Sequence, residues 1–236
     1  MHQLTTIREC NVEGNNDAVC LTFDVDWACD EVLDDTISLL KRYNVPSTWF
    51  FTHETEYINQ IRQLRNQEIG IHPNFNDLLN SSPIAKNVED VFSTLKSIIP
   101  DATSMRSHSL TYGDVIARYA IKHGITHVSN YMIPFQSGIS LNCWNDWYGL
   151  THVPYLFQDS VLFYLNSTLG VTDLILNYQG LRVFNFHPIH VYLNTESIGR
   201  YEQTRHLHRN PKELIKFRYT GYGTRSRLID LLDCFK

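Results

Sequence analysis

Acidic and histidine side chains follow several apolar segments of this sequence at the point where each segment ends. Asp24 and Asp26 stand at the end of the segment 19–24, His72 follows EIGI, and His187 follows LRVFNF. Carboxylates and imidazoles are common metal ligands, and they are also the groups that most often transfer protons in catalysis. The pattern therefore indicates metal or acid–base chemistry.

Asp24 and Asp26 are two residues apart, so their side chains project to the same face of an extended strand. Two carboxylates on one face repel each other unless a cation or a proton separates their roles. One of them could therefore bind a metal ion while the other acts as a base. The alternative is a pair of solvated loop acids, with Asp26 capping the following helix.

Arg106 and His190 extend this set of polar residues. Arg106 lies in TSMRSH and could orient Asp24, because arginine pairs with a carboxylate through two parallel hydrogen bonds; the alternative is an exposed arginine at a strand end. His187 and His190 are three residues apart in FHPIHV, and the zinc-protease motif HExxH is absent. One of these two histidines could belong to the core.

Segments of strand and helix character alternate along the chain. We expect strands at 19–24, 47–52, 68–72, 103–108, 126–130 and 181–187, and helices at 31–43, 54–66, from Ile84 to Ile98, at 112–123 and at 225–235. Residues 131–160 break the alternation, and we expect long loops there with an irregular strand around HVPYLF, which could form a pocket wall. The pattern predicts an α/β fold, either a doubly wound sheet or a (β/α) barrel, and both place the strand ends at one rim.

Composition excludes several classes of protein. The chain has 236 residues, and 20 Lys and Arg against 25 Asp and Glu give a net charge of −5 without a basic run, so we expect no nucleic-acid partner. No apolar stretch approaches the roughly 20 residues of a membrane span, and we expect a cytoplasmic protein with one domain over residues 1–236. Five cysteines without a CxxC pair predict reduced thiols.

Four motifs, taken in order and spacing, resemble those of the polysaccharide deacetylase family, carbohydrate esterase family 4. They are TFDVDWA at 22–28, EIGIHPNFN at 68–76, MRSH at 105–108 and VFNFHPIH at 183–190. The residues of these motifs are most similar to those of the WbmS-type branch of the family, which is associated with bacterial O-antigen clusters. The resemblance covers about residues 19–190 and implies a distorted (β/α)7-type barrel.

The resemblance also implies residue roles. Family members hydrolyse the acetamide of a sugar with a divalent metal ion, usually zinc. By position in the motifs, Asp24 corresponds to the general base, and Asp26 and His72 correspond to metal ligands. Arg106 corresponds to the arginine that tethers the base, and His187 to the histidine that protonates the leaving amine.

The second motif departs from the family pattern, because Asn76 stands where a second ligand histidine is usual. An amide binds zinc less well than an imidazole does. We expect His108 to be the third ligand, with His190 and Asn76 as alternatives. If they do not bind the metal, His190 and Asn76 are candidates for binding substrate.

The aromatic pocket wall is less clearly marked. Trp144, Trp147 and Tyr155 are candidates for stacking on a sugar ring, and Phe157 competes with them for a place in the wall.

We therefore expect a metal-dependent deacetylase of an N-acetylated sugar, in bacterial O-antigen or capsule biosynthesis. Its substrate would be a small-molecule or lipid-linked sugar. Two alternatives remain open. One is a catalytically silent sugar-binding protein, suggested by Asn76. The other is a metal-dependent hydrolase of a different non-peptide C–N bond.

Overall fold

The computed structural model describes residues 4–14, 17–80, 87–165 and 170–236. Within these ranges the strands join in one ten-stranded sheet with the order β7-β8-β6-β5-β4-β3-β2-β10-β9, and β1 pairs with β2. The strands are β1 Leu4–Thr5, β2 Val19–Asp24, β3 Ser47–Phe51, β4 Gln67–Ile71, β5 Ser104–Met105, β6 His127–Val128, β7 Trp144–Asn145, β8 Thr151–His152, β9 Phe157–Gln158 and β10 Arg182–Phe186. Their pairings are parallel except for β7 with β8.

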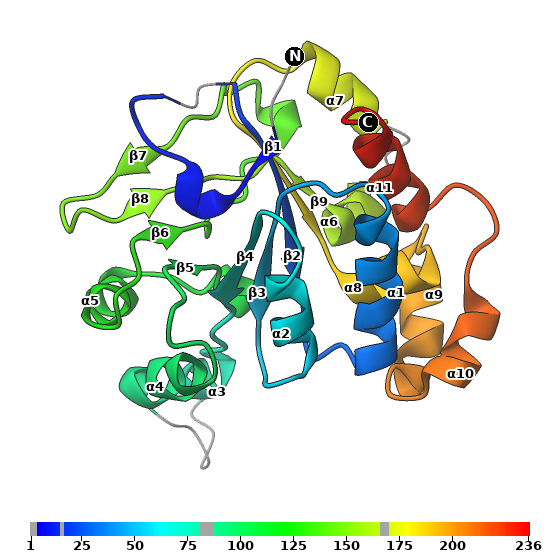
Figure 1. The fold of residues 1–236 in the computed structure, drawn as a ribbon, viewed down its shortest axis with the longest axis horizontal. Coiled ribbons are helices and arrows are strands. Elements are labelled where there is room, and N and C mark those ends of the chain that lie inside the picture. Colours follow the sequence, from blue (N-terminus) through cyan, green and yellow to red (C-terminus); the bar gives the residue numbers. More distant parts are fainter. Residues whose placement is uncertain (1–3, 15–16, 81–86, 166–169) are drawn as a thin grey trace.

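The sheet curls into an incomplete barrel, as expected for the (β/α)7-type fold (Figure 1). Strand β2 lies between β3 and β10, so segments far apart in the sequence are neighbours at the centre of the sheet. Phe23 pairs in register with both Trp49 and Phe186. Among the described residues no pairing joins β7 to β9, the two ends of the strand order, which makes the barrel a distorted one.

Helices cover the sheet on its outer side. In Figure 1, α1, α8 and α9 lie on one side of the central strands, and α4 and α5 lie on the other. The helices are α1 Asp30–Lys41, α2 Tyr57–Arg62, α3 Asn76–Leu79, α4 Val88–Ile98, α5 Asp114–Lys122, α6 Asp159–Leu165, α7 Val171–Asn177, α8 Pro188–Leu193, α9 Ile198–Thr204, α10 Pro211–Leu214 and α11 Thr224–Asp233. Short 3-10 turns, among them η2 at His108–Leu110 and η4 at Arg205–Leu207, connect some of them.

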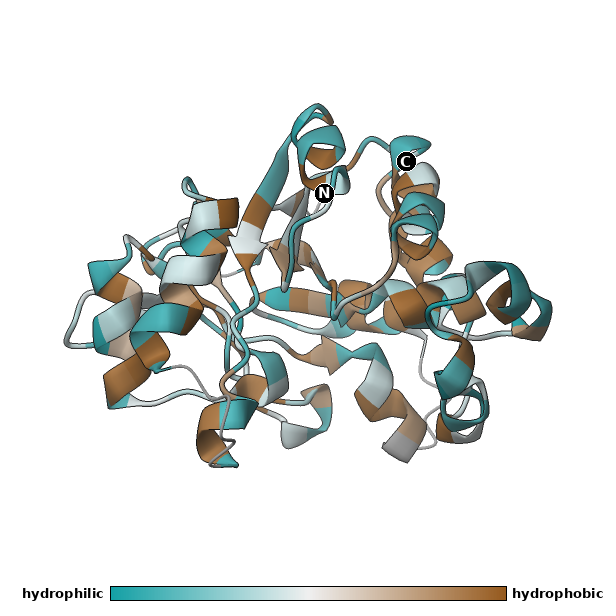
Figure 2. Cartoon of the chain, turned by 90° about the horizontal axis from the view of Figure 1, so that it is seen from below, coloured by the Kyte–Doolittle hydropathy of each residue, from teal (hydrophilic) through white to brown (hydrophobic). Residues whose placement is uncertain are grey.

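The core lies where the strands meet these helices. All six residues of β2 are buried, as expected for a strand that is covered on both faces. The rings of Phe23 and Trp49 stack with centroids 4.2 Å apart. Helix α1 buries Leu33, Ile37 and Leu40, the stripe expected from their spacing. Hydrophobic residues accordingly gather on the central strands and on parts of the helices in Figure 2.

Several expected elements are shorter in the structure. The strand expected at 103–108 is hydrogen-bonded as β5 only over Ser104–Met105, and the helix expected at 54–66 is α2 over Tyr57–Arg62. Helix α4 begins at Val88, and Ile84 lies outside the described residues. Residues 131–160 contain β7, β8 and β9, whereas we expected one irregular strand there.

The carboxyl ends of β2, β4, β5 and β10 point to one rim, because these strands run parallel. The polar residues of the sequence motifs follow these ends and therefore gather at that rim. In the described part of the chain, no helix has both the length and the apolar character needed to cross a membrane.

Candidate active site and metal centre

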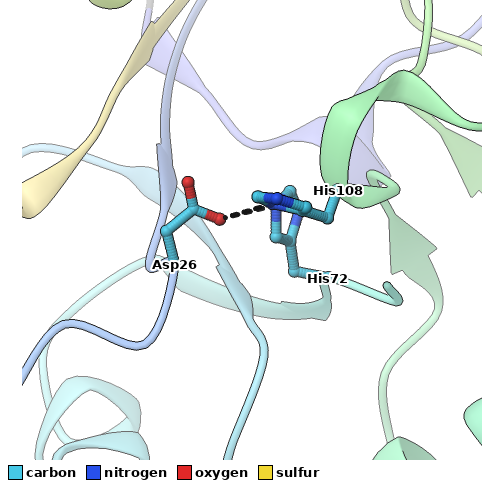
Figure 3. A group of neighbouring side chains, drawn as sticks. All are labelled: Asp26, His72 and His108. Atoms are coloured by element: carbon cyan, nitrogen blue, oxygen red, sulfur yellow. Dashed lines mark hydrogen bonds and ion pairs between the residues drawn. The ribbon is translucent and has the colours of Figure 1, made fainter. Parts of the chain in front are cut away.

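Asp26, His72 and His108 converge at the rim from three different strand ends (Figure 3). The Nε2 atom of His72 lies 3.1 Å from Oδ1 of Asp26, and the Nδ1 atom of His108 lies 2.9 Å from the same oxygen. One ligand atom from each residue lies within 4.8 Å of the others. The structure thus brings together the three residues that we predicted as metal ligands.

Two unusual turns aim these side chains. Asp26 and Trp27 have positive φ angles of 46° and 56°, and Ser109 and Leu110, which follow His108, both have φ of 55°. Positive φ is uncommon outside glycine, and such strained residues concentrate at functional sites. Hydrogen bonds to neighbouring strand ends hold both turns: Trp27 N donates to Thr52 Oγ1 at 3.0 Å, and His108 N donates to Pro73 O at 2.9 Å.

Asp24 lies beside this cluster, with its Oδ1 atom 3.9 Å from Nδ1 of His72, and it is bound by Arg106, as predicted. The Nη1 atom of Arg106 donates to Oδ1 of Asp24 at 3.0 Å, and Asn185 Nδ2 donates to the other carboxylate oxygen at 2.7 Å. Burial opposes the charge on Asp24, but Arg106, together with His72 and His187, holds the pKa of Asp24 below its usual value. Asp24 is therefore ionised at neutral pH.

Arg106 is fully buried, and its guanidinium has several further partners. It lies between the rings of Phe50 and Tyr155, at 4.8 and 4.4 Å from their centroids. It also donates to Thr22 Oγ1, Asn185 Oδ1, Ser129 O and Ser129 Oγ at 2.7–2.9 Å. These contacts fix Arg106, and Arg106 in turn fixes one oxygen of Asp24.

His187 lies at the end of β10 with its ring between two groups of acids. Its Nδ1 atom lies 2.6 Å from Oδ1 of Asp159, and its Nε2 atom lies 3.5 Å from Oδ2 of Asp26. Burial disfavours the imidazolium, but the carboxylate of Asp159, with smaller contributions from Asp26 and Asp24, raises the pKa of His187 to about 10. His187 therefore carries a proton at neutral pH, as a general acid must.

A divalent metal ion fits the donor set of Asp26, His72 and His108. One carboxylate oxygen and two imidazole nitrogens are ligands that zinc prefers, and three protein ligands leave a coordination position open. The second ring nitrogen of His72, Nδ1, is buried without a hydrogen-bond partner among the described residues and lies 3.9 Å from Oδ1 of Asp24. This separation is longer than a hydrogen bond, so in this structure Asp24 lies near the ligand histidine without orienting its ring.

Comparison with known proteins assigns the family. The WbmS-like polysaccharide deacetylase family matches residues 21–205, which is more than half of the chain and contains all four motifs. The chain belongs to this family. The search of curated proteins finds no match.

One solved structure supports this assignment. The chain is 38% identical to WbmS of Bordetella bronchiseptica, assigned as a polysaccharide deacetylase involved in O-antigen biosynthesis, with 99% of this chain and 98% of that chain covered at a TM-score of 0.92. An assigned polysaccharide deacetylase from Mycobacterium smegmatis is 16% identical, with 94% and 92% covered and a TM-score of 0.49. A 4-α-glucanotransferase from Thermococcus litoralis is 13% identical, with 73% and 33% covered and a TM-score of 0.49.

In this WbmS-like protein, reasoning from the sequence missed Asp159 and Asn185. Asp159 follows β9 and is the first residue of α6, and it binds both the backbone N and the Nδ1 atom of His187. The feature of the sequence that could have identified Asp159 is an acidic residue directly after a short strand. We missed it because we expected mostly loops in this region. Asn185 lies inside the apolar strand β10, and only its position beside Asp24 shows that it is part of the site.

His190 and Asn76, the alternative third ligands, do not join the cluster around Asp26. Asn76 Nδ2 donates to Ser109 Oγ at 3.1 Å, so it supports the turn after His108. His190 forms a second group with Asp159 and His187, and burial lowers its pKa to about 4, which keeps it neutral. His190 also lines the cavity that contains Asp26, His72 and His108, where it can contact a substrate.

The cavity at the candidate metal centre has a volume of about 400 Å³, and its wall contains Asp24, Asp26, His72, His108 and His187; we call it the metal cavity. The aromatic residues expected to bind sugar lie elsewhere. Tyr155 is fully buried against Arg106, so its ring cannot stack on a substrate in this structure, and the expectation for Tyr155 is corrected. Phe157 is buried in the core as well. Trp144 and Trp147 line a separate cavity.

Proposed function

We propose that this protein hydrolyses the acetamide of an N-acetylated sugar, with a divalent metal ion, most often zinc in this family, at Asp26, His72 and His108. The observation that supports this most is the shared cavity. It places the three convergent ligand atoms beside an ionised Asp24 and a protonated His187. A base, an acid and a Lewis-acid site within one cavity are the groups that amide hydrolysis requires.

Asp24 is proposed as the base that accepts a proton from the attacking water. Its pKa lies below the usual value, so it is ionised at neutral pH, and it lines the cavity. Arg106 and Asn185 each donate to one of its oxygens, which fixes the direction of the remaining lone pairs. A fixed base needs little reorganisation when the proton moves.

When bound, a divalent ion supplies Lewis-acid chemistry by polarising the acetamide carbonyl and lowering the pKa of water. His72 and His108 would hold it through imidazole nitrogens, and Asp26 through a carboxylate oxygen.

His187 is proposed as the acid that protonates the departing amine. The Nδ1–H group of His187 donates a hydrogen bond to Asp159, so the Nε2–H group, which faces Asp26 and Asp24, carries the transferable proton. Asp159 is a positioning residue in this scheme, because it acts through His187 and does not line the cavity. Protonation makes the amine a far better leaving group than an amide anion.

The biological setting is proposed by analogy. WbmS of Bordetella bronchiseptica is assigned to O-antigen biosynthesis, and we propose that this chain acts in the synthesis of O-antigen or capsule. A small-molecule or lipid-linked sugar would be the substrate. The single domain over residues 1–236 and the cytoplasmic location stay predictions.

The position of His108 weighs against a catalytically silent sugar-binding protein. That alternative rested on the loss of a ligand histidine at Asn76. His108 places an imidazole nitrogen 2.9 Å from Asp26 and offers the missing donor from a different strand end.

Two measurements on the purified protein test the proposal. We expect about one equivalent of zinc after reconstitution, and release of acetate from at least one member of a panel of N-acetylated sugars. The Asp24→Asn variant is the matched control, because it should keep the metal and lose acetate release. A protein that binds no divalent metal after reconstitution, or one that binds it and releases no acetate from any sugar in the panel, would overturn the proposal.

A further inference from the structure

A second cavity of about 460 Å³ adjoins the metal cavity and is outside the chemistry described so far. It lies between α5 and the β7–β8 hairpin, and its volume is within the range of about 300–1,000 Å³ typical of ligand pockets. Tyr112, Tyr131, Trp144, Trp147 and His152 line it. We call it the aromatic cavity.

Its wall offers flat apolar rings to solvent. The rings of Trp144 and His152 stack with centroids 5.1 Å apart, and Tyr131 lies 5.2 Å from Trp144. Trp147 is 84% exposed and Tyr131 is 42% exposed. Large aromatic side chains are usually buried, so an exposed group of them around a cavity indicates a binding surface.

Three polar atoms of the wall have no hydrogen-bond partner among the described residues. They are Nδ1 of His152, Nδ2 of Asn130 and the hydroxyl of Tyr112. His152 is 2% exposed and Asn130 is 4% exposed, and buried polar atoms are nearly always paired in native proteins. All three residues line the aromatic cavity, so a ligand there can supply the missing partners.

These atoms differ in what they can bind. The Nε2 atom of His152 lies 3.0 Å from Oδ2 of Asp146, so in the uncharged form of the ring Nε2–H donates to Asp146 and Nδ1 is an acceptor. The Oδ1 atom of Asn130 already accepts from Ser107 N, so its free Nδ2 atom is a donor. The Tyr112 hydroxyl can both donate and accept. Sugar hydroxyls, which also donate and accept, match this set.

The charge of the wall excludes a phosphate group. No lysine or arginine is among the described residues that line the aromatic cavity, and its two acids, Asp114 and Asp146, repel anions. Both acids already accept hydrogen bonds, Asp114 from the Tyr148 hydroxyl and Asp146 from Leu150 N, so they do not call for a cation. An uncharged ligand with an apolar face and several hydroxyls fits best.

The aromatic cavity is coupled to the metal cavity through the turn η2. Leu110, the last residue of this turn, lines both cavities. Ser107, which precedes the proposed ligand His108, lines the metal cavity and donates its backbone N–H to Asn130 in the wall of the aromatic cavity. A ligand long enough to cross Leu110 therefore reaches both.

We propose that the aromatic cavity is a second sugar subsite, which holds an uncharged pyranose ring of the same glycan whose acetamide lies at the metal site. The apolar face of that ring lies on Trp147 and Trp144, and its hydroxyls bind Asn130, Tyr112 and His152. The substrate is then an oligosaccharide of at least two rings. This inference rests on the proposed deacetylation and specifies its substrate class.

The four tryptophans allow a direct binding test. Trp27 lines the metal cavity, Trp144 and Trp147 line the aromatic cavity, and Trp49 is fully buried. The indole N–H signals of ¹⁵N-labelled protein, with and without zinc, would be followed by NMR during titration with N-acetylglucosamine, uridine, and N-acetylated disaccharides of several linkages. We expect at least one disaccharide to shift the signals of Trp27, Trp144 and Trp147 together, with Trp49 unchanged.

Other outcomes separate the possibilities. If no sugar shifts Trp144 or Trp147, or if uridine does so and the sugars do not, the second sugar subsite is refuted. If Trp144 and Trp147 respond to sugars while the zinc-loaded protein releases no acetate, the subsite stands and the proposed deacetylation fails. If the protein releases acetate while no sugar changes the signals of Trp144 and Trp147, the proposed deacetylation stands and the second sugar subsite is refuted.

The Trp147→Ala variant tests the subsite in turnover. Trp147 is exposed, so the substitution leaves the core intact. We expect at least a tenfold loss of kcat/KM for the disaccharide that binds, an unchanged value for N-acetylglucosamine, and unchanged zinc content. Trp147→Phe should restore most of the loss, and Phe217→Ala, at an exposed aromatic outside both cavities, should have no effect. Equal losses for both substrates would contradict the proposal.

Discussion

Asp159 binds His187 at two points. One carboxylate oxygen of Asp159 accepts from the backbone N of His187 at 2.7 Å, and the other lies 2.6 Å from its Nδ1 atom. The first contact fixes the end of β10, and the second fixes the orientation of the ring, so that Nε2 faces the cavity. Asp159 thereby sets both the position and the charge of the proposed general acid.

Replacing Asp159 by asparagine is expected to lower the pKa of His187 from its value of about 10. The amide keeps an oxygen that can accept a hydrogen bond but lacks the negative charge that favours the imidazolium. NMR titration of the ring protons in the metal-free protein measures this pKa. An unchanged pKa would show that Asp26 and Asp24 alone hold the proton on His187.

The same shift predicts how stability depends on pH in the metal-free protein. The pKa of His187 is raised on folding from 6.5 to about 10, so its contribution to the free energy of unfolding is complete below pH 6.5. That contribution is lost as the pH rises through about 10. The free energy of unfolding, measured in urea, should therefore fall between pH 6 and pH 10. It should fall less in Asp159→Asn than in the unchanged protein. A decline of equal size in both proteins would contradict this.

The metal site is predicted to depend on three residues and not on Asn76. Asp26→Ala, His72→Ala and His108→Ala should each lose bound zinc, because each removes one of the convergent donors. Asn76→Ala should keep it, since Asn76 contacts Ser109 and none of the donors. Elemental analysis after dialysis measures the effect. Retention of zinc by His108→Ala would direct attention to His190.

Asp24→Asn is expected to keep zinc and to lower kcat by about 10²–10⁴-fold, the usual contribution of a general base. The asparagine has the same shape, but it presents an N–H₂ group to Arg106 or to Asn185, both of which donate to Asp24. Acetate release under saturating substrate measures the loss. Loss of zinc in this variant would mean that Asp24 also supports the ligands.

Arg106→Ala is expected to lower the free energy of unfolding by about 3–5 kcal/mol, because it leaves the buried carboxylate of Asp24 without its cation. Chemical denaturation measures this change. The double variant Arg106→Ala with Asp24→Asn should recover part of the stability, since the unpaired charge is then absent. No recovery would indicate that the lost packing against Phe50 and Tyr155 dominates.

At Gly70 in β4 an added side chain is predicted to be destabilising. An added Cβ would lie 2.7 Å from the ring of Phe50 and 2.7 Å from Ser104 Oγ, so Gly70→Ala should cost about 1–3 kcal/mol through overpacking. Gly199→Ala is the matched control in α9, where the nearest atom to an added Cβ is 3.9 Å away. That variant should be neutral or slightly stabilised in thermal unfolding. A neutral Gly70→Ala would show that Phe50 can move.

Reasoning from the sequence succeeded where local pattern decides structure. Strand β2, helix α1 and strand β10 were predicted to within about two residues, because a short continuous apolar run is typical of a strand buried on both faces and an apolar stripe with a period of 3.6 residues is typical of a helix. Parallel strand ends meet at one rim, so the same pattern also placed Asp24, Asp26, His72 and His187 near one another.

Reasoning from the sequence failed where contacts between distant segments of the chain determine the structure. Asn185 sits among apolar residues, and its role depends on the pairing of β10 with β2. Tyr155 was expected in a pocket, but it packs against Arg106, a contact that no local pattern contains. Strand β5 has only two residues, which is too short for any periodicity to mark its bounds.

The position of β2 between β3 and β10 has a consequence for the order in which the site can form. Asp26, His72 and His108 lie in the first half of the chain, whereas β10 begins at Arg182. Until β10 has been synthesised, the edge of β2 that later pairs with β10 has no strand partner, and Asp24 lacks Asn185. Growing chains therefore carry the proposed metal ligands before the acid and its partner exist, and an open β2 edge is a site for premature aggregation.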